Sequence, residues 1–366
     1  MSSALPPPAT APKKIVYLWG AGATQAEALF LGARPVNLLM RDSEQLGEGV
    51  ATRILKELPK KWRPSFSADK GTDIEKLISL LTASSLVAYE KVAENIRKLY
   101  FEDICRSLAA AQILTNPSLA IALLSLHHDT QFSTHEQLSG IITTNHDGLL
   151  QVASQKVFGA VNLGIAFQAG DGKTLPSDVP PALLHLHGSF TWTFGLPVRV
   201  CVLDDNSAYS PETVWIPPTI LKESKNYPFN KLAGHAYELL SRRCDVLRVV
   251  GSSLTQNDWN IISMIFNAQR HCESRKLAAF KIELIMSPTS GATIAGDCSY
   301  LRNLTPISYL SDGDFAAYKE DPSTYTPEMR NALFYWLKQK LTYHRQRGDL
   351  NTPTDPVLAI VSGDAS

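Results

Sequence analysis

Polar side chains of types that can do chemistry follow several short apolar runs in this sequence. Thr144, Asn145 and Asp147 lie in the stretch TTNHDG, directly after one such run. His187 follows another. An amide orients a reacting group, an imidazole exchanges protons near neutral pH, and a carboxylate supports positive charge. These residue types make the two loops candidates for a site of acid–base chemistry.

A glycine turn and a serine-containing loop follow two further apolar runs. The residues concerned are Gly20, Ala21, Gly22 and Thr24 in GAGAT, and Gly251, Ser252 and Ser253 in the later loop. A glycine turn lets the backbone approach a pyrophosphate while N–H groups of a helix N-terminus point at it. Because ligands bind outside the carboxyl ends of the strands in doubly wound sheets, the four loops are expected to converge on one dinucleotide.

Each loop also has an ordinary structural interpretation. Asn145 and Asp147 are typical helix caps after a strand, and Ser252 is a typical turn residue. His187 fits a core histidine equally well. Gln25 stands where the third glycine of the dinucleotide fingerprint would be. The shared edge of all four loops is what favours a common ligand.

The elements that must position these loops are readable from the apolar pattern. Five runs have the length of buried strands: 15–19, 140–143, 182–186, 246–250 and 281–286. Most are nearly continuous rather than alternating, which is typical of parallel strands covered on both faces. Apolar residues at helical spacing predict helices over 73–81, 89–108 and 118–126. The expected fold class is α/β: a Rossmann-like doubly wound, mainly parallel sheet with a helical insertion over about 48–125.

One domain, residues 13–345, is expected between two flexible tails at 1–12 and 350–366. A last helix is indicated by a cap and first-turn proline at Thr326-Pro327, with Leu333, Leu337 and Leu341 forming one stripe.

The composition excludes several classes of protein. Lys plus Arg is 35 and Asp plus Glu is 35, so the formal net charge is zero. No overall electrostatic attraction therefore favours direct binding of nucleic acid. Five scattered cysteines without a CxxC pair argue against a disulfide framework and a cysteine zinc site. Without a signal-like start or an apolar run of about 18 residues, a cytoplasmic location away from the membrane is expected.

In their order along the chain, these motifs resemble those of the sirtuin family. GAGAT, TTNHD, LHGS and GSS match a GAG turn, a T-x-N-x-D loop, an HG dipeptide and a late G-[TS]-S loop, over roughly residues 13–300. The resemblance is closer to the sirtuin-like branch of bacterial antiphage systems, with its DIEKLISLL-like helices and a PPT-x-x-K segment, here Pro217-Pro218-Thr219 and Lys222. The paired CxxC zinc motifs and the GIPDFR-type loop of the deacylating members are missing; ALFLGARPVN stands in place of that loop.

The resemblance implies NAD as substrate, with no metal. Nicotinamide departs from NAD as a neutral molecule and needs no general acid, so one base and one orienting group are sufficient. His187 is implied as the base and Asn145 as the residue that orients water or ribose. The implied dinucleotide-binding residues are Gly20, Ala21, Gly22, Thr24, Thr144, Asp147, Gly251, Ser252 and Ser253. Asp147 would hold the nicotinamide end, while His146 and Asp258 receive no firm role.

The expected function is an NAD glycohydrolase that yields nicotinamide and ADP-ribose, as an antiviral effector in bacterial defence. A homo-oligomer is expected, together with a partner protein such as an ATPase from the same operon. Cyclised ADP-ribose is an open alternative product. Three other functions stay open: an NAD-dependent deacylase, a non-catalytic sensor of NAD or ADP-ribose, and a metal hydrolase. The metal hydrolase would use His185, His187 and Asp147, with His127, His128 and Asp129 as further candidate ligands.

Overall fold

A six-stranded parallel sheet forms the centre of the computed structural model. The structure describes residues 11–31, 56–63, 74–83, 86–168, 174–175, 181–201, 203, 207–217, 225–254, 258–307 and 331–350. The strands of this sheet are β1 (Lys13–Trp19), β2 (Glu136–Thr143), β5 (Ala182–His185), β9 (Val246–Val250), β10 (Lys281–Ile285) and β11 (Leu304–Pro306). Each of the five predicted apolar runs forms one of these strands, and β11 was not predicted.

The order of the strands is β11-β10-β9-β1-β2-β5. The chain therefore builds outward from β1 through β2 to β5, then returns to the other side of β1 and builds outward again from β9. This is the strand order of doubly wound dinucleotide-binding sheets, in which the order reverses between two neighbouring central strands. Here that switch point lies between β1 and β9. The predicted Rossmann-like α/β fold is confirmed.

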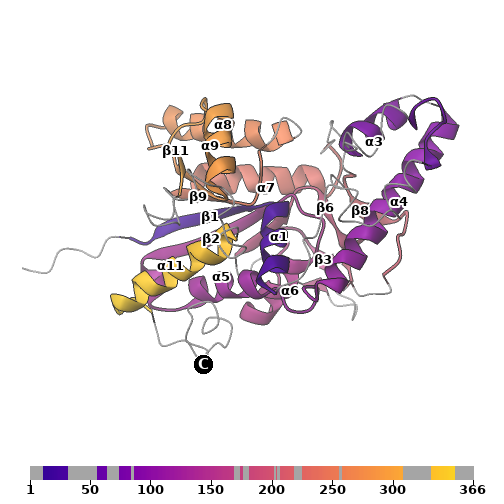
Figure 1. Cartoon of the computed structure of the whole chain (residues 1–366). Helices are drawn as coiled ribbons and strands as arrows, with labels where there is room; N and C mark the ends of the chain where they lie inside the picture. Colours follow the sequence, from indigo (N-terminus) through magenta and orange to yellow (C-terminus); the bar gives the residue numbers. More distant parts are fainter. Residues whose placement is uncertain are drawn as a thin grey trace, which may run out of the picture.

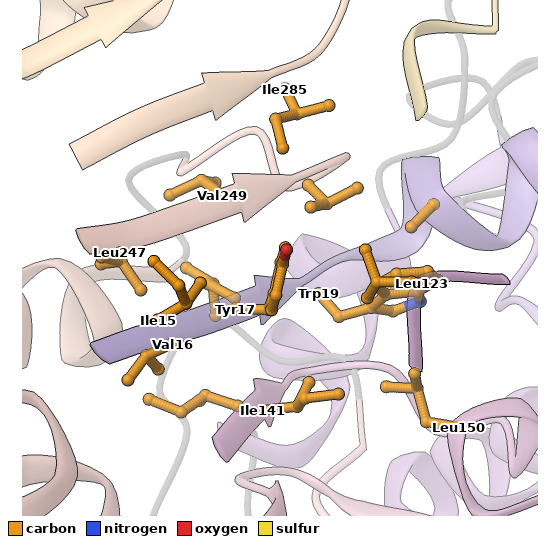
Figure 2. Close-up of a cluster of buried hydrophobic side chains, with 14 of the residues drawn as sticks. Ile15, Val16, Tyr17, Trp19, Leu123, Ile141, Leu150, Leu247, Val249 and Ile285 are labelled. Carbon is orange, nitrogen blue, oxygen red and sulfur yellow. The ribbon is translucent and has the colours of Figure 1, made fainter. Parts of the chain in front are cut away.

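Helices cover both faces of the sheet, as its apolar strands require (Figure 1). One face carries α1 (Ala21–Phe30), α5 (Ser118–His128), α6 (Leu149–Phe158) and α11 (Ala332–Gln346). The other carries α7 (Phe229–Arg242), α8 (Trp259–Ser274) and α9 (Pro288–Asp297). Figure 2 shows side chains of β1 among those of β2, β9 and β10 and beside Leu123 of α5 and Leu150 of α6.

A second, smaller sheet and a helical arm pack beside this main body. The smaller sheet contains β3 (Phe167–Gln168), β4 (Thr174–Leu175), β6 (Gly188–Thr193), β7 (Val198–Val200) and β8 (Thr213–Trp215). Helices α3 (Ile74–Ala83) and α4 (Val87–Ala110) form the arm, which extends away from the main sheet (Figure 1). Both helices fall within the predicted insertion, whereas α5, at its end, packs in the main core. A 3₁₀ helix at Phe132–Thr134 precedes β2.

The last described helix, α11, begins at Ala332 and is capped by Asn331, whose side chain accepts a hydrogen bond from the Phe334 N–H at 3.1 Å. The predicted cap at Thr326-Pro327 lies outside the described residues. The predicted stripe of Leu333, Leu337 and Leu341 is buried against the main core. In the described parts of the chain, none of the helices has the length and apolar character needed to cross a membrane.

A buried charged cluster joins β9 to β10 and, across β1, to β2. The Arg248 guanidinium donates to both carboxylate oxygens of Glu136, at 2.6 and 2.8 Å, and to Glu283 at 2.8 Å. Lys340 of α11 donates to Glu136 at 2.7 Å, and the Arg248 guanidinium lies 5.1 Å from the centre of the Trp336 ring. The cluster therefore ties three strands and the last described helix together.

Candidate functional site

The glycine turn and the serine loop meet at the switch point between β1 and β9. The N–H of Gly20 donates to the Val250 carbonyl at 2.9 Å, and the N–H of Gly22 donates to the Gly251 carbonyl at 2.8 Å. A Cβ on Gly20 or Gly22 would lie within 3 Å of backbone atoms of the serine loop. Glycine is needed here because the two loops pack backbone against backbone.

Replacing Gly251 with alanine is expected to lower the free energy of unfolding by about 2–4 kcal/mol. Gly251 has φ +60°, and an added Cβ would lie 2.2 Å from the Ala23 nitrogen. The control is Gly159→Ala, because Gly159 has φ +68° but nothing within 4 Å of an added Cβ. Urea unfolding of both variants separates the clash from the cost of a left-handed residue, about 1–2 kcal/mol. Equal losses would contradict the tight packing of the two loops.

Asn145 joins the glycine turn to the loop after β2. Its side-chain amide donates to the Gly20 carbonyl at 3.1 Å and to the Thr24 hydroxyl at 2.9 Å. Its own backbone N–H donates to the Thr143 hydroxyl at 3.1 Å, and that hydroxyl donates to the Trp19 carbonyl at 2.9 Å. Asn145 is 7% exposed, so these bonds hold its amide in one orientation inside the protein.

Asp147 lies behind Asn145 and Thr24 and organises both. One carboxylate oxygen accepts from the Thr24 hydroxyl at 2.7 Å and from the Asn145 amide at 3.3 Å. The other accepts from the Leu149 N–H at 3.2 Å, at the first turn of α6. Burial raises the pKa of Asp147 above its ordinary value, while these three donors act in the opposite direction. Asp147 therefore fits both interpretations of the sequence. It supports the start of α6, and it orients two candidate site residues.

His187 stands between β5 and β6, in a turn bonded to the Asn145 loop. The Leu186 N–H donates to the Thr143 carbonyl at 2.9 Å, and the Phe190 N–H donates to the His146 carbonyl at 2.8 Å. The rings of His146 and His187 lie 6.3 Å apart, and His187 is 3% exposed. The structure thus brings the histidine turn beside the amide loop at one edge of the sheet.

An aromatic wall backs this turn on the side of the helical arm. The His146 ring stacks on Phe190 at 5.2 Å and meets Trp215 edge to face at 5.0 Å. Tyr100 of α4 stacks on Trp215 at 6.0 Å. His146 also bonds the Ile216 carbonyl through Nε2 at 3.0 Å. His146 therefore packs next to His187 as a supporting residue. Its position depends on contacts with β8 and α4, which the local sequence does not indicate.

The alternative metal site has little support in this geometry. Among the described residues, no group of three or more His, Cys, Asp and Glu side chains is placed to hold a metal ion. His185 contacts the Asn145 carbonyl with Nδ1 at 3.3 Å and the Gln151 side chain with Nε2 at 3.4 Å. Its burial lowers its pKa to about 4, so it is a neutral structural imidazole.

The remaining predicted residues lie along the same edge. Ala21 and Thr144 are partly buried, Ser252 is 8% exposed, and Gly22 and Ser253 are exposed to solvent. Asp258 lies at the N-cap position of α8 without a side-chain capping bond. Of the PPT-x-x-K segment, only Pro217 is among the described residues. The predicted roles in holding a dinucleotide stay predictions.

Glu27 is a buried carboxyl group near this edge that the motifs did not indicate. It lies one turn after Thr24 in α1, and its oxygens accept from the Leu119 and Ala120 N–H groups at 2.9 and 2.6 Å. Those two N–H groups begin α5, so Glu27 clamps α1 to the N-terminus of α5. Burial raises the pKa of Glu27 from 4.5 to about 8, against the lowering effect of the two N–H groups.

We expect Glu27 to make the protein less stable as the pH rises from about 4.5 to about 8. Over this window the unfolded chain loses the Glu27 proton while the folded chain, with its pKa raised from 4.5 to about 8, retains it. The Glu27→Gln variant lacks this contribution, so the parent should lose a few kcal/mol more than the variant across the window. Urea unfolding at several pH values measures the difference, with exposed Glu90→Gln as control. Parallel curves for parent and Glu27→Gln would contradict the prediction.

Comparisons with known proteins add little to this geometry. No protein-family model matches the chain, and no curated protein matches it. Among the solved structures that it resembles is one concerning the structural basis of sirtuin substrate affinity. The identity is 15%, the TM-score is 0.33, and the match covers 84% of this chain and 94% of the other. At this identity and TM-score, the likeness says nothing about what this chain does.

Proposed function

We propose that this chain is an NAD glycohydrolase that cleaves the bond between nicotinamide and ribose and releases nicotinamide and ADP-ribose. One observation carries the proposal: four loops are joined by hydrogen bonds along the edge that contains the switch point. The chain of contacts runs from Gly251 to Gly22, from Gly20 to Asn145, and on to the turn of His187. A dinucleotide has the length and the mixed phosphate, ribose and cationic ring chemistry to lie along such an edge.

The proposed chemistry begins at the nicotinamide end. Nicotinamide leaves as a neutral molecule, and the ribose carbon gains positive character that a nearby carboxylate favours. Asp147 supplies that carboxylate, held by Thr24, Asn145 and the start of α6. Asn145 orients the attacking water or the ribose through its amide, and His187 removes the proton of that water or hydroxyl. The glycine turn and the serine loop hold the pyrophosphate and adenosine.

Hydrolysis is favoured over deacylation by what the sequence lacks. It contains no CxxC pair, and the residues after the glycine turn are ALFLGARPVN rather than a GIPDFR-type loop. Both missing features belong to the acyl-lysine apparatus of the family that the motifs resemble. A role as a defence effector, a homo-oligomeric state and control by a partner such as an ATPase are part of the proposal on the strength of that resemblance.

The proposal is tested by incubating the purified full chain with NAD and separating the products by chromatography. Nicotinamide and ADP-ribose in equal amounts without any acylated peptide are the expected result. Parallel incubations add an acylated peptide or the proteins encoded beside this chain. Nicotinamide release that requires the peptide would replace hydrolysis by deacylation, and cyclic ADP-ribose would replace hydrolysis by cyclisation. Saturable NAD binding without turnover in every incubation would favour the sensor.

A further inference from the structure

A cavity of about 440 Å³ lies along α6 and beside the smaller sheet. Its wall combines one face of α6 with residues of the smaller sheet and of the segment before α5. Most of this wall is apolar: Leu114, Leu149, Val152, Val161, Leu163, Phe167, Val200 and Leu203. A volume of this size is within the range of small-molecule sites, about 300–1,000 Å³.

The polar groups of the wall are engaged with protein atoms, which leaves the interior apolar in character. Thr191 donates its hydroxyl to the Gln151 side chain at 2.9 Å, and Cys201 donates to the Thr191 carbonyl at 3.1 Å. Gln155 donates to the Gly159 carbonyl at 2.8 Å. A polar ligand body would find few partners inside and would lose its bonds to water. The cavity therefore suits a hydrocarbon chain or another apolar group.

Lys156 gives the cavity a charge at its rim. It is the one charged side chain among the described residues that line the cavity, and it is exposed at the surface. Its ammonium group donates to the Asn116 side chain at 3.1 Å, which places it at the end of α6 rather than in the interior. An ammonium group has three N–H donors, so a carboxylate can bind it as well.

We propose that this cavity binds an apolar chain with a terminal carboxylate, with the chain inside and the carboxylate at Lys156. The proposal does not depend on the NAD reaction. It concerns a site that lies along α6, the helix that begins at the Asp147 loop. Gly148 lines the cavity, and the next residue, Leu149, donates to Asp147.

The test is calorimetric titration of the full chain with octanoate, decanoate, dodecanoate and dodecanol, with the carboxylates below their micelle concentrations and dodecanol below its solubility limit. Affinity is expected to rise by up to about fourfold with each added methylene until the cavity is full. The Val152→Trp variant fills the cavity and is expected to abolish binding. If that variant loses its circular dichroism spectrum, Val161→Phe, at another half-buried position of the wall, replaces it.

The role of Lys156 is tested by the difference between dodecanoate and dodecanol. Lys156→Gln is expected to weaken dodecanoate about two- to fivefold and to leave dodecanol unchanged, while Lys231→Gln on α7 changes neither. The proposal would be overturned if none of the four ligands bound. It would also be overturned if a folded Val152→Trp or Val161→Phe variant bound them as tightly as the parent does. Equal loss of both twelve-carbon ligands in Lys156→Gln would overturn the assignment of the carboxylate.

Discussion

Replacing His187 with alanine is expected to lower kcat/KM for NAD by about 10²- to 10⁴-fold, the usual contribution of a positioned acid–base group. Affinity for NAD should change little, because in the proposed site the glycine turn and the serine loop, not His187, hold the phosphates and adenosine. Nicotinamide release measures the rate, and titration of the variant with NAD measures the affinity. The control is His128→Ala, at an exposed position on α5.

Asn145→Ala should reduce turnover to a similar level, but this change also removes buried hydrogen bonds that stabilise the fold. The Asn145 amide donates to the Gly20 carbonyl and to Thr24, so truncation leaves buried acceptors without a donor and costs about 1–3 kcal/mol of stability. Unfolding must therefore be measured beside activity. A folded His187→Ala and a folded Asn145→Ala that both consume NAD at the parent rate would show that the roles are wrongly assigned.

The second large effect is on stability and concerns Arg248. Arg248→Met should lower the free energy of unfolding at neutral pH by about 3–5 kcal/mol, because the Glu136 carboxylate loses both of its bonds to the guanidinium while buried. Urea unfolding measures the loss. The control is Arg242→Met on the surface of α7, where the ion pair with Glu238 spans 3.5 Å and should contribute about 0–1 kcal/mol.

Two further results would separate charge from packing in the same cluster. The double variant Arg248→Met with Glu136→Gln should recover part of the loss, since no buried carboxylate is left unpaired. Burial alone would raise the pKa of Glu136, but Arg248 and Lys340 hold it well below the ordinary 4.5. The parent therefore loses this stabilisation as the pH falls below about 4.5, and Arg248→Met should lose less over the same range. If both proteins lost the same unfolding free energy as the pH falls below about 4.5, the ion-pair explanation would be contradicted.

The main sheet could be predicted from the sequence because its strands are local signals. A run such as IVYLW is apolar on both faces, as a covered parallel strand requires, and VLRVV is apolar apart from Arg248. The smaller sheet escaped prediction because its strands are only two to six residues long. Two of its pairings, β3 with β7 and β6 with β8, also join segments that are separated by other elements. Arg248 illustrates the same limit. Its partners Glu136 and Glu283, and Lys340, which also binds Glu136, come from three distant segments.

The position of the candidate site was predictable for a simple geometric reason. Carboxyl ends of parallel strands meet at one edge, so residues that follow separate strands are neighbours even when they are far apart in sequence. The bonds within the site were not predictable. The contact of Asn145 with Gly20 and the clamp of Glu27 on α5 depend on side-chain orientations that the core imposes. The support of His146 by Trp215 and Tyr100 depends on an arm whose docking has no local signature.

Protein groups alone form the bonds between the glycine turn and the amide loop. A ligand that binds across them needs to freeze few backbone torsions, so little of its interaction energy is spent on ordering these loops. Preformed dipoles of this kind also need no reorientation when charge develops during a reaction. For the proposed dinucleotide, folding itself would meet most of the entropic cost of ordering these two loops.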